Sequence, residues 1–316
     1  YRDKVIKTMQ AWNGKLIEIP YTKKISSTSI HEKIKNLYFN SQSRVSILKR
    51  LVNSQKLVRV LESHSALTGL IIENLSIKNK NKSESFHAMW SSSLTDSTLR
   101  GKPDNQSVDY STRILGLNEI MDVTSKPVIF DGDNGGRLEH IKFLVRSLER
   151  SGVSALVIED KSGLKKNSLY KNQKGVKQES ISKFSKKLKT ASLAKNSKDF
   201  YIIARIESFI LGKSLNDALK RAEAYVKAGA DAILIHSKSD NPREIFSFSK
   251  KFIKSKNYRP IIAVPSTYSK TLEKTLIKNG VKIVIYANHL LRASYPSMVE
   301  TAKSILTSKR SYDIEK

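Results

Sequence analysis

Three carboxylates in the middle of the chain have the residue types and spacing of a divalent-metal site. Asp131 and Asp133 lie two residues apart at the end of one apolar run, and Glu159 lies at the end of the next. Alternate residues of a strand share a face, so both aspartates are expected to point the same way. Carboxylate oxygens suit Mg²⁺, and crowded carboxylates repel one another unless a cation lies among them. The alternative is that strand-end aspartates cap the following helix.

Arg205 and His236, near the ends of two later apolar runs, are the candidates for binding an anion. A buried guanidinium needs an anionic partner, and its fork suits phosphoryl or carboxylate oxygens. The alternatives are a salt bridge from Arg205 to Glu207 or another barrel carboxylate, and a core role for His236. Trp90 is expected to wall the pocket, and the serines at 92 and 93 to hold a carboxylate; plain core packing is the alternative for Trp90.

The polar segment from Lys161 to Ser168 follows a predicted strand and contains Gly163. A polar loop of this kind is typical of a lid that closes over a substrate and excludes water. Lys165 and Asn167 would then reach the bound anion. The alternative is a solvated basic loop.

These residues belong to a repeating pattern that starts at about residue 57, in which short apolar runs alternate with amphipathic, lysine-rich segments. The alternation predicts βα units around a parallel sheet. Eight runs fit a (β/α)₈ barrel of the TIM type better than an open doubly wound sheet. In a barrel, the carboxyl ends of all strands open onto one face, so the polar residues there would converge. The predicted strands are Leu57–Ser63, His87–Ser93, Pro127–Asp133, Ala155–Asp160, Tyr201–Ser208, Ala232–Ser237, Pro260–Pro265 and Lys282–Ala287.

Residues 1–45 do not continue this pattern and are predicted to form a separate N-terminal segment, with the barrel at 46–316. Within that segment, Ile25–Ile30 resembles the closing motif of small cytidylyltransferases, whose hydroxyls meet nucleotide phosphates at a helix start. The resemblance would make the segment the remnant of a nucleotidyltransferase domain with its linker. An ordinary serine or threonine helix cap is the alternative. At the other end of the chain, Leu290–Leu306 is predicted to be an amphipathic helix.

Composition narrows the class of protein. A length of 316 residues fits one barrel plus an appendage, and the lack of cysteine excludes disulfides, thiolate metal sites and cysteine nucleophiles. No apolar run is long enough to cross a bilayer and no secretory leader is present, so we expect a cytoplasmic protein, although the first residue is not Met. The net charge of +28 comes from scattered lysines, which favours small anions over nucleic acid as partners.

The ordered series of polar motifs at the strand ends resembles the phosphoenolpyruvate mutase/isocitrate lyase superfamily over about 46–305. Two departures from the family pattern are visible: Gly163-Leu164 replaces Phe-Pro in the lid, and Asn-Gly-Gly replaces Thr-Gly-Tyr-Gly after the paired aspartates. The matching segments are Trp90–Leu94, Asp104, Asp131–Gly136, Glu159–Ser168, Ala204–Glu207 and His236–Lys238.

The resemblance implies a Mg²⁺-dependent enzyme that acts on a small, doubly anionic 2-oxo or enol acid. It implies Asp131 as the direct metal ligand, with Asp133 and Glu159 reaching the metal largely through water, as Asp104 also would. The implied catalytic residues are Asp104, Lys165, Asn167, Arg205 and His236, and the implied substrate-binding residues are Trp90, Ser92, Ser93, Leu94 and Ser168. Members of the family are commonly homotetramers that exchange their last helices, so a homo-oligomer is expected.

The absence of cysteine disfavours the carbon–carbon cleavage of isocitrate lyases, which need a catalytic cysteine. Mutase and phosphonopyruvate hydrolase remain, and both proceed through a loose, metaphosphate-like transition state. Asn167 followed by Ser168 matches the mutase lid pattern, which predicts interconversion of phosphoenolpyruvate and phosphonopyruvate, the first step of phosphonate biosynthesis. The other alternative is an inactive basic barrel that binds a partner.

Overall fold

The computed structural model describes residues 2–13, 41–79, 82–163, 165–170 and 172–315. The chain divides into two compact units, residues 1–37 and 38–316. The first unit contributes one described helix, α1 (Arg2–Gln10). The cytidylyltransferase-like stretch at 25–30 lies outside the described residues, and the predicted division at residue 45 stays a prediction.

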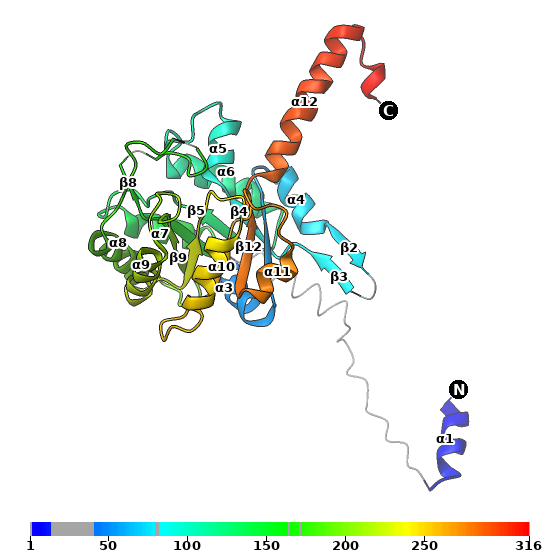
Figure 1. Ribbon diagram of the computed structural model, residues 1–316. Helices are drawn as coiled ribbons and strands as arrows, with labels where there is room; N and C mark the ends of the chain where they lie inside the picture. The colour runs from blue at the N-terminus through cyan, green and yellow to red at the C-terminus, as the bar shows by residue number, and fades with distance from the viewer. Residues whose placement is uncertain (1, 14–40, 80–81, 164, 171, 316) are drawn as a thin grey trace. The chain divides into compact units, whose positions relative to one another are not determined.

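Eight parallel strands of the second unit close into a barrel (Figure 1). The order around the barrel is β1, β12, β11, β10, β9, β6, β5 and β4, and β4 pairs again with β1. Seven predicted apolar runs contain one whole strand each, and the eighth overlaps β12, which begins one residue earlier at Val281; this confirms the predicted fold. The strands are β1 (Val58–Glu62), β4 (Ala88–Ser91), β5 (Val128–Asp131), β6 (Ala155–Glu159), β9 (Tyr201–Ile206), β10 (Ala232–Ile235), β11 (Ile261–Ala263) and β12 (Val281–Tyr286).

The apolar runs form these strands because their side chains are buried on both faces of the sheet. In β6, Ala155 and Val157 pack inside the barrel, whereas Leu156 and Ile158 pack against the surrounding helices. Burial of one such Leu, Ile or Val side chain stabilises the fold by about 1.5–3 kcal/mol. The double burial explains why the runs are continuous in hydrophobicity and do not alternate with polar residues.

The helices cover the outside of the barrel with apolar faces that have helical spacing. In α7, the buried residues include Ile141, Leu144, Val145 and Leu148, and these share one face. These helices lie in the connections between successive parallel strands, and α5 and α6 share the connection from β4 to β5. The helices of this layer are α4 (Ala66–Asn74), α5 (Ser93–Leu99), α6 (Tyr110–Asp122), α7 (Ile141–Arg150), α8 (Ile181–Ala194), α9 (Leu215–Lys227), α10 (Arg243–Phe252) and α11 (Glu273–Lys278).

Helix α3 (Ser41–Ser54) closes the end of the barrel at which the strands begin. Its Leu48 and Val52 belong to the inner apolar cluster of the barrel. The buried Arg44 side chain donates to the main-chain oxygen of Thr124, and the Arg44 carbonyl accepts from Ser154, just before β6. With this end sealed, the carboxyl ends of the strands form the accessible face.

Two short antiparallel ribbons lie outside the barrel, and the sequence pattern did not predict either of them. One pairs β2 (Ser76–Asn79) with β3 (Lys82–Ser85), and the other pairs β7 (Lys161–Ser162) with β8 (Lys177–Gln178). Their residues are mainly polar, so they lack the apolar runs that identify buried strands. In the second ribbon, β7 forms the start of the predicted lid, whereas β8 lies beyond the lid's last residue, Ser168.

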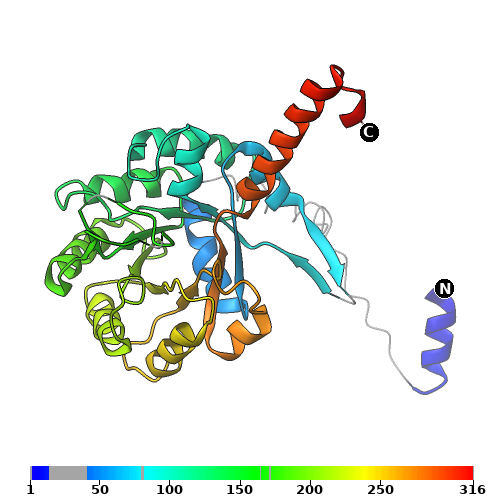
Figure 2. The ribbon, with the colours of Figure 1, turned by 45° about the horizontal axis from the view of Figure 1, so that its top comes forward.

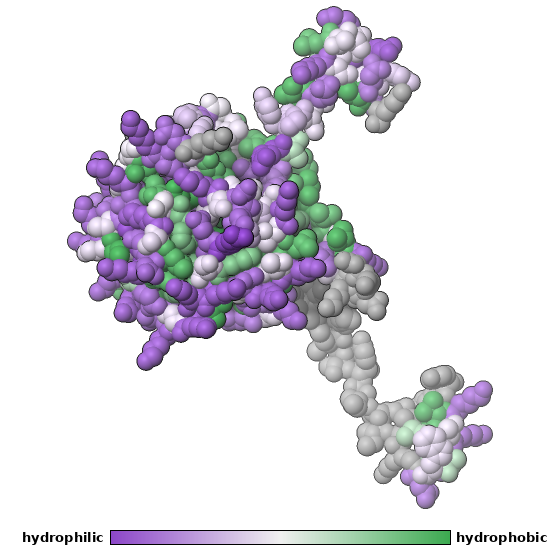
Figure 3. All heavy atoms as spheres, in the orientation of Figure 1, coloured by the Kyte–Doolittle hydropathy of each residue, from purple (hydrophilic) through white to green (hydrophobic). Residues whose placement is uncertain are grey.

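The last long helix, α12 (His289–Ser308), leaves the barrel and projects away from it (Figures 1 and 2). Only Leu291 is buried in this helix, and the side chains of Tyr295, Met298 and Leu306 are 65%, 57% and 67% exposed. Further exposed apolar residues at the foot of α12, in α4 and β2, form part of the apolar surface visible in Figure 3. None of the helices in the described ranges is both long and apolar enough to cross a bilayer.

Candidate active site

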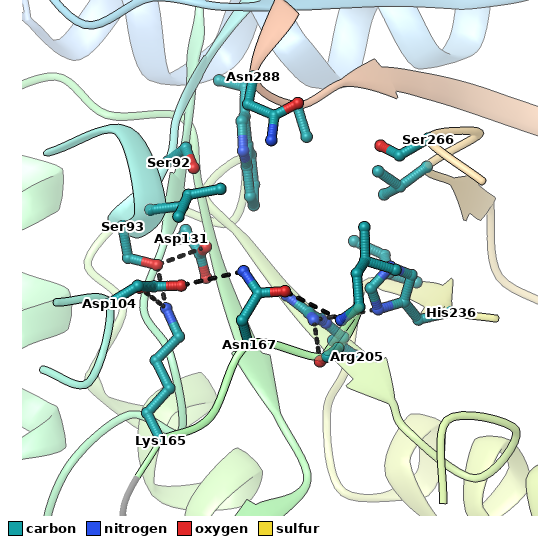
Figure 4. Close-up of a pocket in the computed structure, with 17 residues that line it drawn as sticks. Ser92, Ser93, Asp104, Asp131, Lys165, Asn167, Arg205, His236, Ser266 and Asn288 are labelled. Atoms are coloured by element: carbon teal, nitrogen blue, oxygen red, sulfur yellow. Dashed lines mark hydrogen bonds and ion pairs between the residues drawn. The ribbon is translucent and has the colours of Figure 1, made fainter. Parts of the chain in front are cut away.

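A pocket opens at the carboxyl ends of the barrel strands (Figure 4). Its empty space is about 600 Å³, including space open to solvent. Eleven of the thirteen predicted site residues line it, and the other two, Asp133 and Glu159, are buried beside it. The predicted residues in the lining are Trp90, Ser92, Ser93, Leu94, Asp104, Asp131, Lys165, Asn167, Ser168, Arg205 and His236.

The paired aspartates are positioned by the sharp exit of the chain from β5. Asp131 is the last residue of the strand, whereas Asp133 lies beyond it, so the prediction of both on one strand was wrong. Asp133 has a φ of 50°, a left-handed conformation that is uncommon for a residue with a side chain. A Cβ at Gly132 would lie 2.8 Å from the Val157 carbonyl oxygen, so only glycine fits between the two aspartates. The turn nevertheless leaves both carboxylates close together at the carboxyl end of β5.

Lys165 of the lid joins these carboxylates. Its ammonium lies 2.7 Å from Asp104 Oδ1 and also pairs with Asp133 and Ser93. The Ser93 hydroxyl in turn donates to Asp131 Oδ2 over 2.9 Å. The cluster of Asp104, Asp131 and Asp133 therefore already surrounds one positive charge.

The two buried aspartates respond differently to this environment. Burial favours the neutral form of Asp131, but Lys165, Arg205 and Arg113 outweigh burial and hold its pKa below the usual value. Burial raises the pKa of Asp133, and the charge of Asp131 raises it further despite the nearby Lys165. Asp131 is thus the carboxylate of the pair that is ionised most readily, as expected for a metal ligand.

Glu159, the last residue of β6, is a buried carboxylate with few partners. Neither of its side-chain oxygens has a hydrogen-bond donor among the described residues. Its nearest cationic groups are Arg205 Nη2 at 3.4 Å and Lys161 Nζ at 3.6 Å. Burial raises the pKa of Glu159 to about 7. Both carboxylate oxygens of Glu159 therefore still lack a hydrogen-bond donor within the described part of the chain.

Arg205, near the end of β9, is held by neighbours and still lines the pocket. Its Nε donates to Glu207 Oε1 over 2.6 Å, and its Nη2 donates to Ser168 Oγ over 2.7 Å. His236, just after β10, places Nδ1 3.0 Å from Arg205 Nη2 and 3.1 Å from Glu207 Oε1. The salt bridge considered as an alternative for Arg205 exists, and it orients the guanidinium beside His236 in the pocket.

The charge states of this group follow from the same contacts. Burial would raise the pKa of Glu207, but Arg205 and Lys161 outweigh burial and hold the pKa well below its usual value. Burial and Arg205 lower the pKa of His236, so its ring is neutral at pH 7. When Arg205 donates to Nδ1, the neutral imidazole carries its proton on Nε2 and can donate one hydrogen bond to an anion without adding charge.

The described lid residues fold over the pocket. Asn167 Nδ2 donates to Asp104 Oδ2 over 3.3 Å, and Lys161 Nζ donates to Ser168 Oγ over 2.6 Å. Gly163 has a φ of 81°, which permits the turn into this segment. Lys165 and Asn167 contact Asp104, and Ser168 contacts Arg205 of β9, so these side chains close one side of the pocket (Figure 4).

Several residues of the site were not among the predicted site residues. Glu207 orients Arg205, and Leu169, Ser266 and Asn288 line the pocket. Ser266 directly follows a predicted strand, which is a usable signal for a pocket residue. Asn288 directly follows the predicted strand Lys282–Ala287 and gave the same signal, but an asparagine ahead of a helix is also typical of an ordinary cap.

The donor set fits Mg²⁺. Within the described ranges, no three His, Asp or Glu side chains form a ready metal cage. Magnesium does not need one, because it takes one or two carboxylates directly and keeps several waters. The unpartnered oxygens of Glu159 could accept from such waters, and the aspartates around Lys165 already hold a cation.

Known proteins resemble this chain in sequence and in structure. The family described as phosphoenolpyruvate phosphomutase matches residues 48–306. A phosphoenolpyruvate phosphomutase of Tetrahymena pyriformis is 36% identical over 88% of this chain and 89% of its own length. Solved structures agree: a phosphoenolpyruvate phosphomutase of Streptomyces platensis subsp. rosaceus has a TM-score of 0.78 and 32% identity, covering 86% of this chain and 90% of its own. A phosphonopyruvate hydrolase complex with oxalate and Mg²⁺ has a TM-score of 0.74 and 30% identity, covering 84% and 88%.

The closed barrel, the strand-end carboxylates and the sequence match over most of the chain agree with one another. The family match begins at residue 48 and so does not include the cytidylyltransferase-like stretch at 25–30. This chain is an enzyme of the phosphoenolpyruvate phosphomutase family, within the isocitrate lyase/phosphoenolpyruvate mutase superfamily.

Proposed function

We propose that the chain interconverts phosphoenolpyruvate and 3-phosphonopyruvate as a phosphomutase. The observation that carries the proposal is the position of Asn167: its side chain lines the pocket beside Arg205 and is fixed by Asp104. An amide at this place can hold a transferring phosphoryl group while the closed lid excludes water. The reaction needs no co-reactant, because the P–C bond of phosphonopyruvate breaks and a P–O bond to the enolate oxygen forms.

The metal in this proposal is Mg²⁺, held directly by Asp131 and through water by Asp104, Asp133 and Glu159. Bound there, Mg²⁺ would neutralise the charge of the enolate and carboxylate oxygens. Lys165 lies at the same cluster and would turn its ammonium toward the phosphoryl oxygens when the ion is present.

The other residues bind and orient the phosphoryl group. Arg205 and His236 supply donors from β9 and β10, and Glu207 keeps the guanidinium in position. Phosphoryl transfer passes through a loose transition state, so positioning and charge are what the protein can contribute. Trp90 and Leu94 form apolar walls that keep water from the reacting atoms.

Phosphonopyruvate hydrolysis is the second candidate, because a solved hydrolase has a TM-score of 0.74 with this chain. The two reactions differ in whether water reaches the phosphoryl group. In a ³¹P NMR assay with Mg²⁺ and phosphonopyruvate, the mutase produces phosphoenolpyruvate. Formation of pyruvate and phosphate without phosphoenolpyruvate would establish the hydrolase in its place, and no conversion at all would leave the inactive basic barrel.

The exposed apolar residues of α12 support a homo-oligomer in which this helix packs on another copy, and we expect a tetramer. Tyr295, Met298 and Leu306 would then be covered. Light scattering of the purified protein measures the assembly directly. We place the enzyme in the cytoplasm, at the first step of phosphonate biosynthesis.

A further inference from the structure

Asn288 is a pocket residue that the mechanism above does not use. It follows β12 by two positions, directly precedes α12 and lines the pocket. Its Oδ1 is buried and has no hydrogen-bond partner among the described residues. Figure 4 shows the side chain directed into the pocket. The unpartnered Oδ1 is an acceptor, which a carboxylate cannot satisfy, but the Nδ2 of the same amide is a donor and faces the pocket in Figure 4.

Asparagine ahead of a helix normally caps it, but Asn288 makes no side-chain cap bond to α12. Glu62, at the end of β1, replaces it in that role. Glu62 Oε2 accepts from the backbone N–H groups of Leu290 and Leu291 at 3.2 and 3.4 Å, and its other oxygen pairs with His64. Because Glu62 satisfies the start of α12, the Asn288 amide is free to bond to something in the pocket.

The order of strands shows which part of the substrate lies near this amide. In the closed eight-stranded ring, β1 is opposite β9, which carries Arg205. The two neighbours of β1 are β12 and β4, and the residues that follow them into the pocket are Asn288 and Ser92. In phosphonopyruvate the carboxylate is at the far end of the molecule from phosphorus. With phosphorus at Arg205, the carboxylate reaches the side of the pocket between Asn288 and Ser92.

We propose that Asn288 binds the substrate carboxylate by donating a hydrogen bond from its side-chain amide, and so selects for a carboxylate at that end of the substrate. The inference rests on the proposed function for the orientation of the substrate. A neutral donor suits this position, since the carboxylate keeps its charge throughout the reaction. The contact is equally strong before and during phosphoryl transfer, so it contributes to KM and not to kcat.

The decisive variant is Asn288→Asp. Aspartate caps a helix as well as asparagine does, so a capping role predicts wild-type kinetics. A carboxylate-binding role predicts that Asn288→Asp raises KM by about 10- to 100-fold, because a donor to a charged group is replaced by a like charge. Asn288→Ala should raise KM by less, while kcat of both variants stays close to wild type. Asn241→Asp is the matched control: it adds the same charge on an exposed loop after β10, outside the pocket lining.

Oxalate binding in the presence of Mg²⁺, measured by calorimetry, tests the same contact without turnover. Weaker oxalate binding by Asn288→Asp and unchanged binding by Asn241→Asp support the proposal. Unchanged KM and oxalate affinity in Asn288→Asp would overturn it, as would a loss confined to kcat. If wild-type protein binds oxalate but converts neither substrate, the proposed function fails and the calorimetric comparison still decides the role of Asn288.

Discussion

The Arg205 guanidinium and the Glu207 carboxylate, two residues apart in the chain, are joined by a hydrogen bond of 2.6 Å. Glu207 is fully buried and also lies 3.4 Å from Lys161 Nζ and 3.1 Å from His236 Nδ1. Glu207 thus fixes the guanidinium of Arg205, which lines the pocket, and also pairs with the buried ammonium of Lys161, which does not line it. Removing its charge leaves Arg205 and Lys161 without their main counter-charge in the interior.

For that reason, Glu207→Gln is expected to lower kcat by about 100-fold and to reduce the free energy of unfolding by about 3–5 kcal/mol. Steady-state kinetics and denaturant unfolding measure the two effects. Glu119→Gln, on the exposed surface of α6, is the control for the loss of one negative charge. A Glu207→Gln protein that is less stable but has wild-type kcat would show that Glu207 is structural only.

Asp131→Ala is expected to abolish turnover while the fold remains intact. The variant removes the carboxylate of the Asp131 and Asp133 pair that is ionised more readily and is proposed to bind Mg²⁺ directly. Loss of a metal that neutralises charge in the transition state should reduce kcat by about 1,000-fold or more. Circular dichroism checks the fold, and Asp240→Ala, in an exposed loop of the same barrel face, should behave like wild type. Undiminished activity of Asp131→Ala would remove the metal assignment.

Affinity for Mg²⁺ should rise with pH through neutrality because of Glu159. Burial raises the pKa of this carboxyl to about 7, so it is protonated below that pH and ionised above it. Only the ionised form can accept from metal-bound water, so the apparent affinity should increase about tenfold from pH 6 to pH 8. Calorimetric Mg²⁺ titrations at several pH values measure this dependence. In Glu159→Gln the group cannot titrate, and an unaltered pH dependence there would assign the effect to another residue.

The buried Arg113 of α6 is expected to be important for stability. Its Nε donates to Asp96 Oδ2 over 2.7 Å, and its guanidinium lies 4.1 Å from the centre of the Phe130 ring. Arg113→Met leaves Asp96 without its buried partner and should cost about 3–5 kcal/mol. Arg146→Met, on the exposed face of α7, should cost less than about 0.5 kcal/mol.

A second substitution tests the cause of the Arg113 effect. In the double variant Asp96→Asn with Arg113→Met, the uncompensated charge is gone, so part of the lost stability should return. Equal stability of the single and double variants in denaturant unfolding would mean that lost packing on Phe130 causes the effect.

The barrel could be predicted from sequence because its strands are buried on both faces. Runs such as 155–160 and 201–208 consist of apolar residues ended by charged ones, a pattern that few other structures produce. The ribbons at 76–85 and 161–178 could not be predicted, because a two-stranded ribbon in solvent needs no pattern of apolar residues in its sequence. The conformation of Asp133 was also missed, because a left-handed residue after a strand has no reliable sign in sequence other than its glycine neighbour.

The site residues that could be predicted are charged or polar side chains, whose burial costs free energy unless a partner or ligand binds them. Asp131, Arg205 and His236 at strand ends are of this kind, and all three line the pocket. The role of Asn288 was not predictable. Asn288 is free to face the pocket because Glu62, 226 positions away in the chain, caps the helix in its place. Which of two polar residues caps a helix is decided by their positions in space.

The β7–β8 ribbon allows the segment between its two strands to change length without disturbing the barrel. The pairing of Lys161 with Gln178 brings the two ends of this segment together at the barrel rim. Once the ends are fixed, the entropy of closing the loop grows slowly, by only about 0.6 kcal/mol for each doubling of length. Residues inserted or deleted in the exposed middle, near Tyr170, therefore cost the barrel little. The segment can diverge, and its chemistry with it, while the eight strands below remain the same.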